Sequence, residues 1–188
     1  MTHKLPIVES YWLRDGLFLA GEYPGAGAPE EMRHRMDAFL ECGIRAFIDL
    51  TEPHELPSYE AALKEAARSR GCAVEYRRFA IRDHNIPSTE TMRRILDEID
   101  SFIQNGLPVY VHCWAGIGRT GTVAGCHLVR QGMTPREALA RVNALYKTRP
   151  PNPFYPASPE REEQVRFVLG WRETPESLHK SRQRFCEG

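Results

Sequence analysis

Apolar residues follow two different spacings along this chain, and the two alternate. Four short segments are rich in β-branched and aromatic residues, as is typical of strands: residues 11–23, 44–50, 72–81 and 108–111. Elsewhere apolar residues recur every three or four positions, which is the spacing of helices that pack one face against a core. This spacing predicts helices over residues 29–42, 58–70, 88–105, 119–129, 134–148 and 158–171.

Turn-forming and helix-capping residues mark where several of these elements begin. A turn at Asp15 folds residues 11–23 into a hairpin. Thr134 and Glu137 have the spacing of a capping box, in which each side chain bonds the other residue's backbone N–H at the start of a helix. Ser158 is predicted to cap the last helix.

The alternation of strands and helices predicts one α/β domain over residues 1–173. Its central sheet is expected to be mainly parallel and covered by helices on both faces. A length of 188 residues suits a single domain with a full core. Residues 174–188 are polar and are predicted to form a C-terminal tail.

Composition narrows the class of protein further. The 25 basic and 25 acidic residues cancel to a formal net charge of +0, so nothing favours nucleic acid or an anionic membrane as a bulk electrostatic partner. No apolar run approaches the roughly 18 residues of a membrane span, and the first residues lack the apolar stretch of a signal peptide. Five cysteines without CxxC pairs argue against a disulfide framework or a metal site. We therefore expect a cytoplasmic monomer without stable membrane association, metal or other cofactor.

The strongest chemical feature is the segment from Cys113 to Arg119. The buried strand 108–111 leads into it, and a helix follows it. Gly116 and Gly118 let this loop curl, so that successive N–H groups form an anion-binding nest at the positive end of the helix. A cysteine there is expected to be ionised near neutral pH. The planar guanidinium of Arg119 matches two phosphate oxygens at once. The loop therefore predicts attack by a thiolate on a phosphate ester.

The spacing Cys-x5-Arg alone is weak, because it also occurs from Cys72 to Arg78. That second segment is strand-like and contains no glycine, so it cannot curl around an anion. Context therefore singles out Cys113 as the candidate nucleophile.

The motif His112-Cys113-x-x-Gly116-x-x-Arg119-Thr120-Gly121 resembles the signature of the cysteine-dependent protein tyrosine and dual-specificity phosphatases. Small size places the chain nearer the dual-specificity group, and the resemblance extends over about residues 11–171. It implies that Cys113 is the nucleophile, that Arg119 binds phosphate, that Thr120 helps the thiolate leave, and that His112 orders the loop. The loop backbone is expected to hold the phosphate oxygens through the following residues: Trp114, Ala115, Gly116, Ile117, Gly118 and Arg119.

The reaction also needs an acid that protonates the leaving oxygen. Asp83 is the best candidate, because it follows a predicted strand and precedes a helix, which places it at the same sheet edge as Cys113. The resembled family also places its acidic aspartate in this loop. Asp49 lies inside an apolar strand and is interpreted as structural. Asp97 and Asp100 are expected on the solvated side of the helix 88–105.

The residues around the loop do not decide between two classes of substrate, aromatic phosphate esters and phosphoinositides. Apolar Trp114 and Ile117, with no lysine in the loop, favour an aromatic ester over an inositol ring that carries several phosphates. The segment Asp83-His84-Asn85-x-Pro87, in contrast, resembles the acid loop of the tensin-homologue phosphoinositide phosphatases, and His84 would then support the site by adding charge.

Three further features lie outside the phosphatase-like motif and the predicted acid loop. Residues 52–59 resemble the variable recognition loop of kinase-associated dual-specificity phosphatases, and residues 149–156 form an aromatic, proline-stiffened loop. Both are interpreted as structural connections. Gln164 lies in the region where the classical tyrosine phosphatases carry a glutamine that orients the hydrolytic water, but Glu160 is the nearer match to that position, and its role is left open.

The sequence thus predicts a phosphomonoester hydrolase that forms a phosphocysteine intermediate. Its expected substrate is phosphotyrosine in a protein or peptide, with phosphoserine and phosphothreonine weaker. A phosphoinositide or inositol-phosphate phosphatase that uses the same residues is the alternative. A pseudophosphatase that only docks phosphoproteins is disfavoured, because Cys113, Arg119, Thr120 and Asp83 are all present. A redox-sensing thiol is compatible with either enzyme.

Overall fold

The computed structural model describes residues 3–173, which include a five-stranded sheet at the centre of the domain. The strand order is β1-β2-β5-β3-β4, and every neighbouring pair is parallel except the hairpin β1-β2. The predicted mainly parallel sheet and the predicted hairpin are therefore confirmed. The strands are β1 (Ser10–Arg14), β2 (Phe18–Gly21), β3 (Ala46–Asp49), β4 (Glu75–Arg78) and β5 (Val109–His112).

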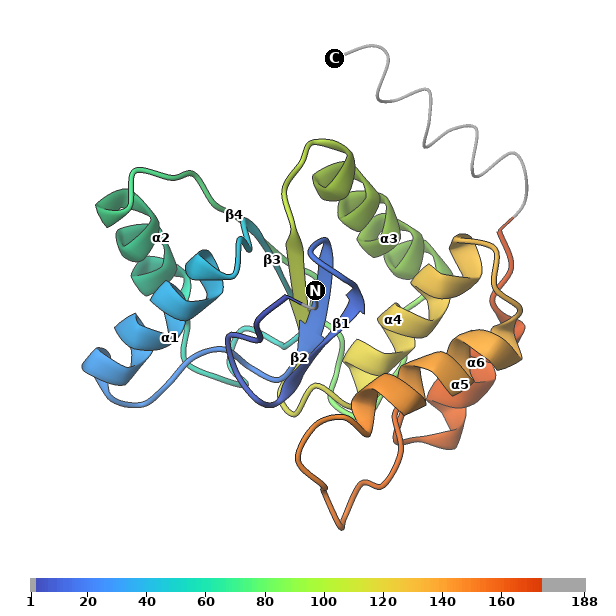
Figure 1. The fold of residues 1–188 in the computed structure, drawn as a ribbon. Helices are drawn as coiled ribbons and strands as arrows, with labels where there is room; N and C mark the ends of the chain where they lie inside the picture. Colours follow the sequence, from blue (N-terminus) through green and yellow to red (C-terminus); the bar gives the residue numbers. More distant parts are fainter. Residues whose placement is uncertain (1–2, 174–188) are drawn as a thin grey trace.

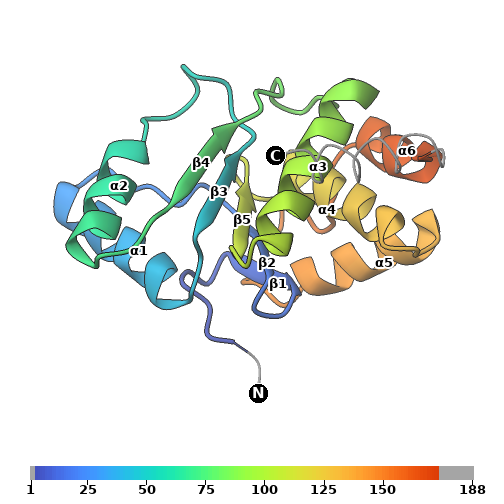
Figure 2. The same cartoon turned by 90° about the horizontal axis from the view of Figure 1, so that it is seen from above.

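Helices cover both faces of the sheet, as predicted. Figures 1 and 2 show α1 and α2 on one face and α3 to α6 on the other. None of the helices in residues 3–173 combines the length and the apolar content needed to cross a membrane. The predicted tail, residues 174–188, lies outside the described residues. The helices are α1 (Pro29–Glu41), α2 (Glu60–Ser69), α3 (Thr89–Gln104), α4 (Gly118–Arg130), α5 (Pro135–Tyr146) and α6 (Glu162–Gly170).

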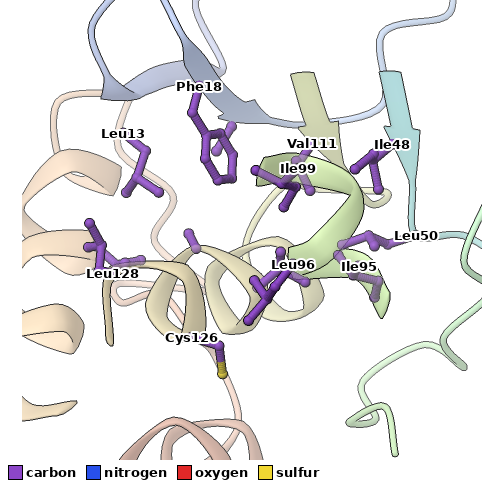
Figure 3. Packing of buried hydrophobic residues seen from close by; sticks show 14 of the residues in the cluster. Leu13, Phe18, Ile48, Leu50, Ile95, Leu96, Ile99, Val111, Cys126 and Leu128 are labelled. Atoms are coloured by element: carbon purple, nitrogen blue, oxygen red, sulfur yellow. The ribbon is translucent and has the colours of Figure 1, made fainter. Parts of the chain in front are cut away.

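The central strand β5 serves both halves of the core, because successive side chains of a strand point to opposite faces. Val109 and Val111 pack into the larger cluster, under α3 and α4, while Tyr110 packs into the smaller cluster, under α1 and α2. Figure 3 shows how Ile99 of α3 lies close to Val111 in the larger cluster. Both faces of β5 are fully buried, which explains why the strand starts with an uninterrupted apolar run, Val109–Val111, before His112.

Helix boundaries agree with the sequence except at the last helix. The capping box of Thr134 and Glu137 is present at the start of α5. The prediction that Ser158 caps the last helix is wrong, because α6 begins at Glu162 with Arg161 as its cap. The hydroxyl of Ser158 instead donates to the carbonyl oxygen of Ile117 at 2.7 Å.

The expectation that Asp97 and Asp100 lie on the solvated side of their helix is incomplete, because both side chains are only partly exposed and both pair with an arginine. The Nη1 atom of Arg130, on α4, lies 2.9 Å from Asp97 Oδ1 and 3.0 Å from Asp100 Oδ2. Glu173 binds the same guanidinium, with Nε donating to Oε2 at 2.6 Å. These acids therefore tie α3 and the end of the described chain to α4.

One buried histidine should make the stability of this fold depend on pH. His127 of α4 is 2% exposed, and its Nδ1 atom has no hydrogen-bond partner among the described residues. Asp100 Oδ1 is 3.8 Å away but belongs to a carboxylate already bound to Arg130. Burial, followed by the charges of Arg130 and Arg14, lowers the pKa of His127 to about 4. The unfolded chain therefore binds a proton that the folded chain lacks, and stability falls as the pH falls from 6.5 towards about 4.

We expect His127→Gln to remove this component of the pH dependence. Between about pH 6 and about pH 4.5, the free energy of unfolding of the wild type should fall by up to about 1.4 kcal/mol per pH unit more steeply than that of the variant. Urea unfolding of both proteins across this range measures the difference. Parallel curves would show that His127 does not titrate in this way.

Candidate active site

The loop from Cys113 to Ile117 joins the end of β5 to the start of α4. Because β5 lies between β2 and β3, the loop emerges at the carboxyl edge in the middle of the sheet, where ligands bind in open α/β folds. Cys113 is buried at the bottom of a pocket of about 200 Å³. The described residues that line the pocket are Asp83, His84, Cys113, Trp114, Ala115, Gly118, Arg119, Tyr155 and Glu160.

The carbonyl groups of this loop are held from outside. Trp114 O accepts from the backbone N–H of Tyr23 at 2.8 Å. Arg149 donates to Ala115 O at 3.1 Å and to Gly116 O at 3.0 Å. With these carbonyls bound around the outside, the N–H groups of the loop and of the first turn of α4 are left as donors for an anion.

The sequence did not predict these supports. Tyr23, Arg149 and Ser158 come from three separate segments, each far along the chain from the loop. Their pairing with the loop carbonyls depends on how the chain folds back, so no local pattern signals it.

The two glycines of the loop are needed for different reasons. Gly116 has φ +68°, and a Cβ atom there would lie 2.2 Å from the backbone carbon of Gly21. Gly118 is needed because it lacks a side chain. A Cβ atom there would lie 2.4 Å from Oε1 of Glu160, so only glycine leaves space for that carboxylate. The predicted freedom of backbone angle therefore applies to Gly116, while Gly118 permits a side chain to approach the loop.

We expect Gly116→Ala to damage both the loop and the fold. The left-handed backbone and the contact with Gly21 should cost at least about 1 kcal/mol of stability. Displacement of the loop should lower kcat/KM by about 10²-fold. Thermal unfolding and turnover of an aryl phosphate measure both effects. Gly27→Ala is the matched control, because a Cβ atom there meets nothing within 4 Å. Equal behaviour of the two variants would show that Gly116 has no special role.

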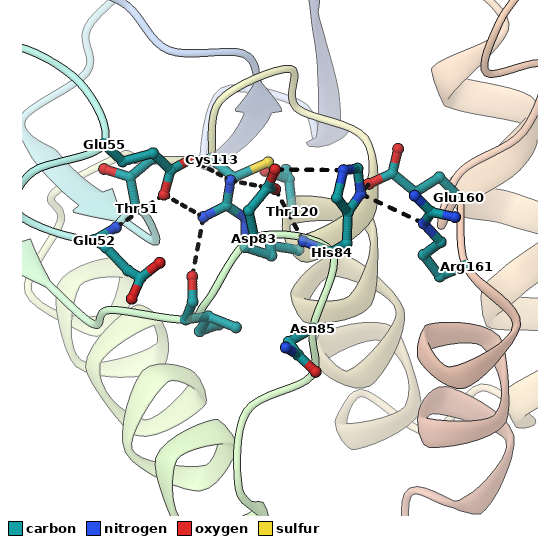
Figure 4. Close-up of polar contacts among 12 residues, drawn as sticks. Thr51, Glu52, Glu55, Asp83, His84, Asn85, Cys113, Thr120, Glu160 and Arg161 are labelled. Carbon is teal, nitrogen blue, oxygen red and sulfur yellow. Dashed lines mark hydrogen bonds and ion pairs between the residues drawn. The ribbon is translucent and has the colours of Figure 1, made fainter.

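Arg119 is held in a fixed orientation by two acids, Glu55 and Asp83, which are labelled in Figure 4. Glu55 binds its guanidinium with both oxygens, Oε2 at 2.7 Å from Nη1 and Oε1 at 2.5 Å from Nη2. Nη1 also donates to the carbonyl of Ile81 at 2.9 Å, and Nη2 to Asp83 Oδ1 at 2.8 Å. Burial acts to lower the pKa of Arg119, but the hydrogen bonds to Glu55 and the nearby negative charges, those of Glu55 and Asp83 among them, together raise the pKa above its usual range. The cation is therefore permanent and pre-positioned.

Glu55 is a functional candidate that the sequence analysis missed. Its segment, residues 52–59, was interpreted only as a structural connection, and that interpretation is incomplete. The same segment also supplies Tyr59, whose hydroxyl lies 2.6 Å from Nε2 of His112. The segment thus orients two residues of the phosphatase-like motif from a distance of more than fifty positions along the chain.

His112 contacts the backbone of the candidate nucleophile. Its Nδ1 atom lies 3.0 Å from the carbonyl oxygen of Cys113. Burial lowers the pKa of His112, against the opposing charge of Asp49. The ring is therefore neutral, with Nδ1–H donating to Cys113 and Nε2 accepting from Tyr59. This is the position that the predicted ordering role requires.

Two buried polar residues near the loop, Thr120 and Asp49, make contacts with different parts of the sheet. The hydroxyl of Thr120 is 3.5 Å from the carbonyl oxygen of Gly21, on β2, and makes this contact rather than one to the sulfur of Cys113. Asp49 accepts from Tyr76 at 2.7 Å and from Arg78 at 2.7 Å, so the structural interpretation of Asp49 agrees with its contacts.

Asp83 lies at the mouth of the pocket, next to the guanidinium. Its side chain is 43% exposed, and Oδ1 accepts from the backbone N–H of His84 at 2.9 Å as well as from Arg119. His84 has φ +58°, which turns its ring so that Nε2 lies 3.4 Å from Asp83 Oδ2 and Nδ1 lies 3.1 Å from Glu160 Oε1. His84 therefore bridges two carboxylates that line the pocket (Figure 4).

The structure distinguishes the two residues of the last segment that the sequence left open. Glu160 lines the pocket, whereas Gln164 is fully buried and donates to the carbonyl oxygen of Asn85 at 3.3 Å. Of the two, Glu160 is the one that faces the reaction centre.

The two apolar residues of the loop point in opposite directions. Trp114 is 54% exposed and lies at the rim of the pocket. The expectation that the Ile117 side chain shapes the pocket is wrong, because it is 1% exposed and packs into the larger core cluster. The curled loop thus turns two side chains only three positions apart in opposite directions.

Comparison with known proteins identifies the class that this fold and site define. A family model described as "Polymorphic toxin system, DSP-PTPase phosphatase" matches residues 24–133, more than half of the chain. The chain belongs to this DSP-PTPase family, within the cysteine-based protein tyrosine and dual-specificity phosphatases. The predicted family resemblance is therefore confirmed.

Individual relatives carry several different substrate names. Mouse protein tyrosine phosphatase domain-containing protein 1 is 31% identical over 147 residues, which are 73% of this chain and 19% of that protein. An Arabidopsis phosphatidylglycerophosphate phosphatase, PTPMT1, is 31% identical over 107 residues, which are 56% of this chain and 30% of that protein. The chain thus spans a third or less of these relatives. The solved structure of Tk-PTP in its active form is 25% identical with a TM-score of 0.65, and the match covers 94% of this chain and 97% of that one.

Proposed function

We propose that this chain is a phosphomonoester hydrolase that removes phosphate from phosphotyrosine in proteins and, more weakly, from phosphoserine and phosphothreonine. One observation carries the proposal. A single pocket brings together the thiol of Cys113, the oriented guanidinium of Arg119 and the carboxyl of Asp83. These groups supply a nucleophile, an anion-binding cation and an acid for the leaving group.

In the first step the Cys113 thiolate attacks phosphorus, and a sulfur–phosphorus bond forms as the ester oxygen–phosphorus bond breaks. The departing oxygen takes the bond's electron pair and the proton of Asp83. In the second step a water oxygen attacks phosphorus while the Asp83 carboxylate accepts a proton from that water. The sulfur–phosphorus bond then breaks, which releases phosphate and restores the thiolate. Arg119 and the loop N–H groups bind the non-bridging oxygens throughout.

The contact between Asp83 and Arg119 suggests how the substrate engages the site. Nη2 of Arg119 now donates to Asp83 Oδ1 at 2.8 Å. A phosphate oxygen that binds Nη2 replaces this carboxylate and frees it to face the leaving group. Glu55 remains on the guanidinium and keeps its plane in place.

The walls of the pocket favour an aromatic ester. Trp114 and Tyr155 are at its rim, and Arg119 is the only permanent cation among the described lining residues. Glu160 contributes a negative charge on the same wall. A ring that carries several phosphates would need more cations than this lining offers.

A second candidate is hydrolysis of phosphoinositides or inositol phosphates. His84 favours it, because this residue lines the pocket beside Asp83 and adds a cation when protonated. One Arabidopsis relative, 27% identical over 99 residues, is named a phosphatidylinositol 3,4,5-trisphosphate 3-phosphatase and protein-tyrosine-phosphatase, so its name includes this class beside the first candidate. Against it, Glu160 lies 3.1 Å from His84 and balances that charge.

A substrate panel tests the choice. The panel compares kcat/KM for a phosphotyrosyl peptide, a phosphothreonyl peptide and a soluble 3-phosphoinositide. We expect kcat/KM to be highest for phosphotyrosine, lower for phosphothreonine and lowest for the phosphoinositide. Trp114→Lys should raise phosphoinositide turnover relative to phosphotyrosine, since it places a cation at the rim. Ile117→Lys is unsuitable for this purpose, because that side chain is buried. The highest kcat/KM on the phosphoinositide would overturn the preference and support the second candidate.

We expect Asp83→Asn to lower turnover by about 10²–10⁴-fold for esters with poor leaving groups. Activated aryl phosphates depart without a proton, so the loss with them should be much smaller. Steady-state rates over a series of leaving groups measure this dependence. Asp97→Asn is the control, because Asp97 pairs with Arg130 on the α3–α4 side and is not among the described residues that line the pocket. The same loss with every leaving group would move the acid role to another residue, and His84 would be tested next.

A further inference from the structure

A second recess lies beside the candidate active-site pocket, on the connection between α5 and α6. Its volume is about 260 Å³, and Tyr155 lines both hollows. The connection projects away from the two helices at the bottom of Figure 1. The described residues that line the recess are Tyr146, Lys147, Arg149, Pro150, Pro151, Asn152, Tyr155 and Pro156.

The walls of this recess are fixed before any ligand arrives. The side chain of Asn152 accepts from the backbone N–H of Phe154 at 3.0 Å and of Tyr155 at 3.2 Å. The hydroxyl of Tyr146 donates to the carbonyl oxygen of Tyr155 at 2.6 Å, which ties the connection to α5. Three prolines restrict the remaining backbone. A preformed recess of this kind loses little conformational entropy on binding.

The recess is positively charged. Lys147 lines it and is exposed, and the buried Arg149 forms part of its wall, with its guanidinium over the ring of Tyr146, 5.2 Å from the centroid. Nε of Arg149 is buried and has no hydrogen-bond partner in the described part of the chain. None of the described lining residues is acidic. An anionic group of the size of one side chain is the complementary ligand.

We propose that this recess is a specificity subsite, which binds an acidic side chain close to the phosphorylated residue of a peptide substrate. The inference rests on the proposed function, since it names the kind of phosphopeptide that the enzyme prefers. Tyr155 is the shared wall, so a peptide whose phosphorylated side chain enters the Cys113 pocket continues across Tyr155 into the recess. Arg149 also holds the loop carbonyls of Ala115 and Gly116, which places the subsite in direct contact with the support of the phosphate loop.

The test compares phosphotyrosyl peptides that carry one glutamate at each flanking position in turn with peptides that carry glutamine there. We expect kcat/KM to be about two- to fivefold higher for glutamate at one or two positions, the size of an exposed charge pair. Lys147→Glu should remove this preference and favour lysine at the same positions. Turnover of a small aryl phosphate should be unchanged in Lys147→Glu, because that substrate occupies only the Cys113 pocket.

Lys64→Glu is the matched control, since Lys64 is an exposed lysine of α2, on the opposite face of the sheet. It should leave the peptide preference unchanged. Hydrolysis of phosphopeptides without any acidic preference, or an equal effect of the two lysine variants, would overturn the subsite and leave the proposed function standing. Turnover of aryl phosphate but of no phosphopeptide would overturn the proposed function and the subsite with it. A response of Lys147→Glu confined to phosphoinositide in vesicles would assign the recess to a lipid headgroup instead.

Discussion

Cys113→Ser is expected to abolish turnover, with a loss of at least about 10⁴-fold, because a serine hydroxyl is a poor nucleophile near neutral pH without an adjacent base. Binding of a phosphate analogue such as tungstate should persist. The anion is held by Arg119 and the loop N–H groups, and these do not depend on the sulfur. Rapid-mixing kinetics on an aryl phosphate and titration with the oxyanion measure the two effects.

Several controls accompany this experiment. Cys126→Ser changes a cysteine in the core cluster, away from the pocket, and should retain turnover. Vanadate should inhibit the wild type, and metal chelators should not. A measurable burst of product in Cys113→Ser, or loss of wild-type activity in chelator, would contradict the phosphocysteine mechanism.

Arg119→Lys is expected to be nearly as damaging, with kcat/KM lower by about 10³-fold. A lysine ammonium is a single point charge and cannot reproduce the two-pronged contact of a guanidinium with phosphate. In the resting protein it also cannot bind both oxygens of Glu55 together with Ile81 O and Asp83, as Arg119 does. A buried carboxylate would then lose part of its hydrogen bonding, so stability should fall as well.

Oxyanion affinity, kcat/KM and thermal unfolding separate these effects. The matched control is Arg70→Lys, a partly exposed arginine that also binds two acids, Asp37 and Glu41. It should change neither affinity nor turnover. A loss of less than about tenfold in Arg119→Lys would show that charge alone is sufficient and that the planar geometry of Arg119 is unimportant.

The elements of the catalytic loop were predictable because they are adjacent in the chain. Strand, loop and helix succeed one another between residues 108 and 130, and each is specified by local properties: an apolar run, two glycines and a helical spacing. Asp83 was predictable for a related reason. Parallel strands end at one edge of the sheet, so residues that follow β4 and β5 lie near each other.

The supports of the site were not predictable in this way. Glu55, Tyr59 and Arg149 contact the motif across separations of 33 to 64 positions. Each of them is an ordinary polar residue in its own segment, and long-range contacts leave no periodic trace in a sequence. Residues 52–59 were therefore misjudged as a simple connection, although they orient both Arg119 and His112.

The directions in which the loop side chains point could not be predicted from the sequence either. Trp114 and Ile117 are both apolar and only three positions apart. In the curled loop one is at the rim and the other is in the core, a difference that depends on the left-handed backbone at Gly116 and on the carbonyl contacts that hold it.

By itself, the sequence determined the class of fold, the order of its elements, the family and the chemical groups of the loop, because spacing and local backbone preference act over a few residues at a time. The tertiary structure alone decided which distant acids hold Arg119, which way the loop side chains point, and that a cationic recess adjoins the pocket through Tyr155. These features depend on the burial of charge and on close packing between segments, and both exist only once the chain has folded.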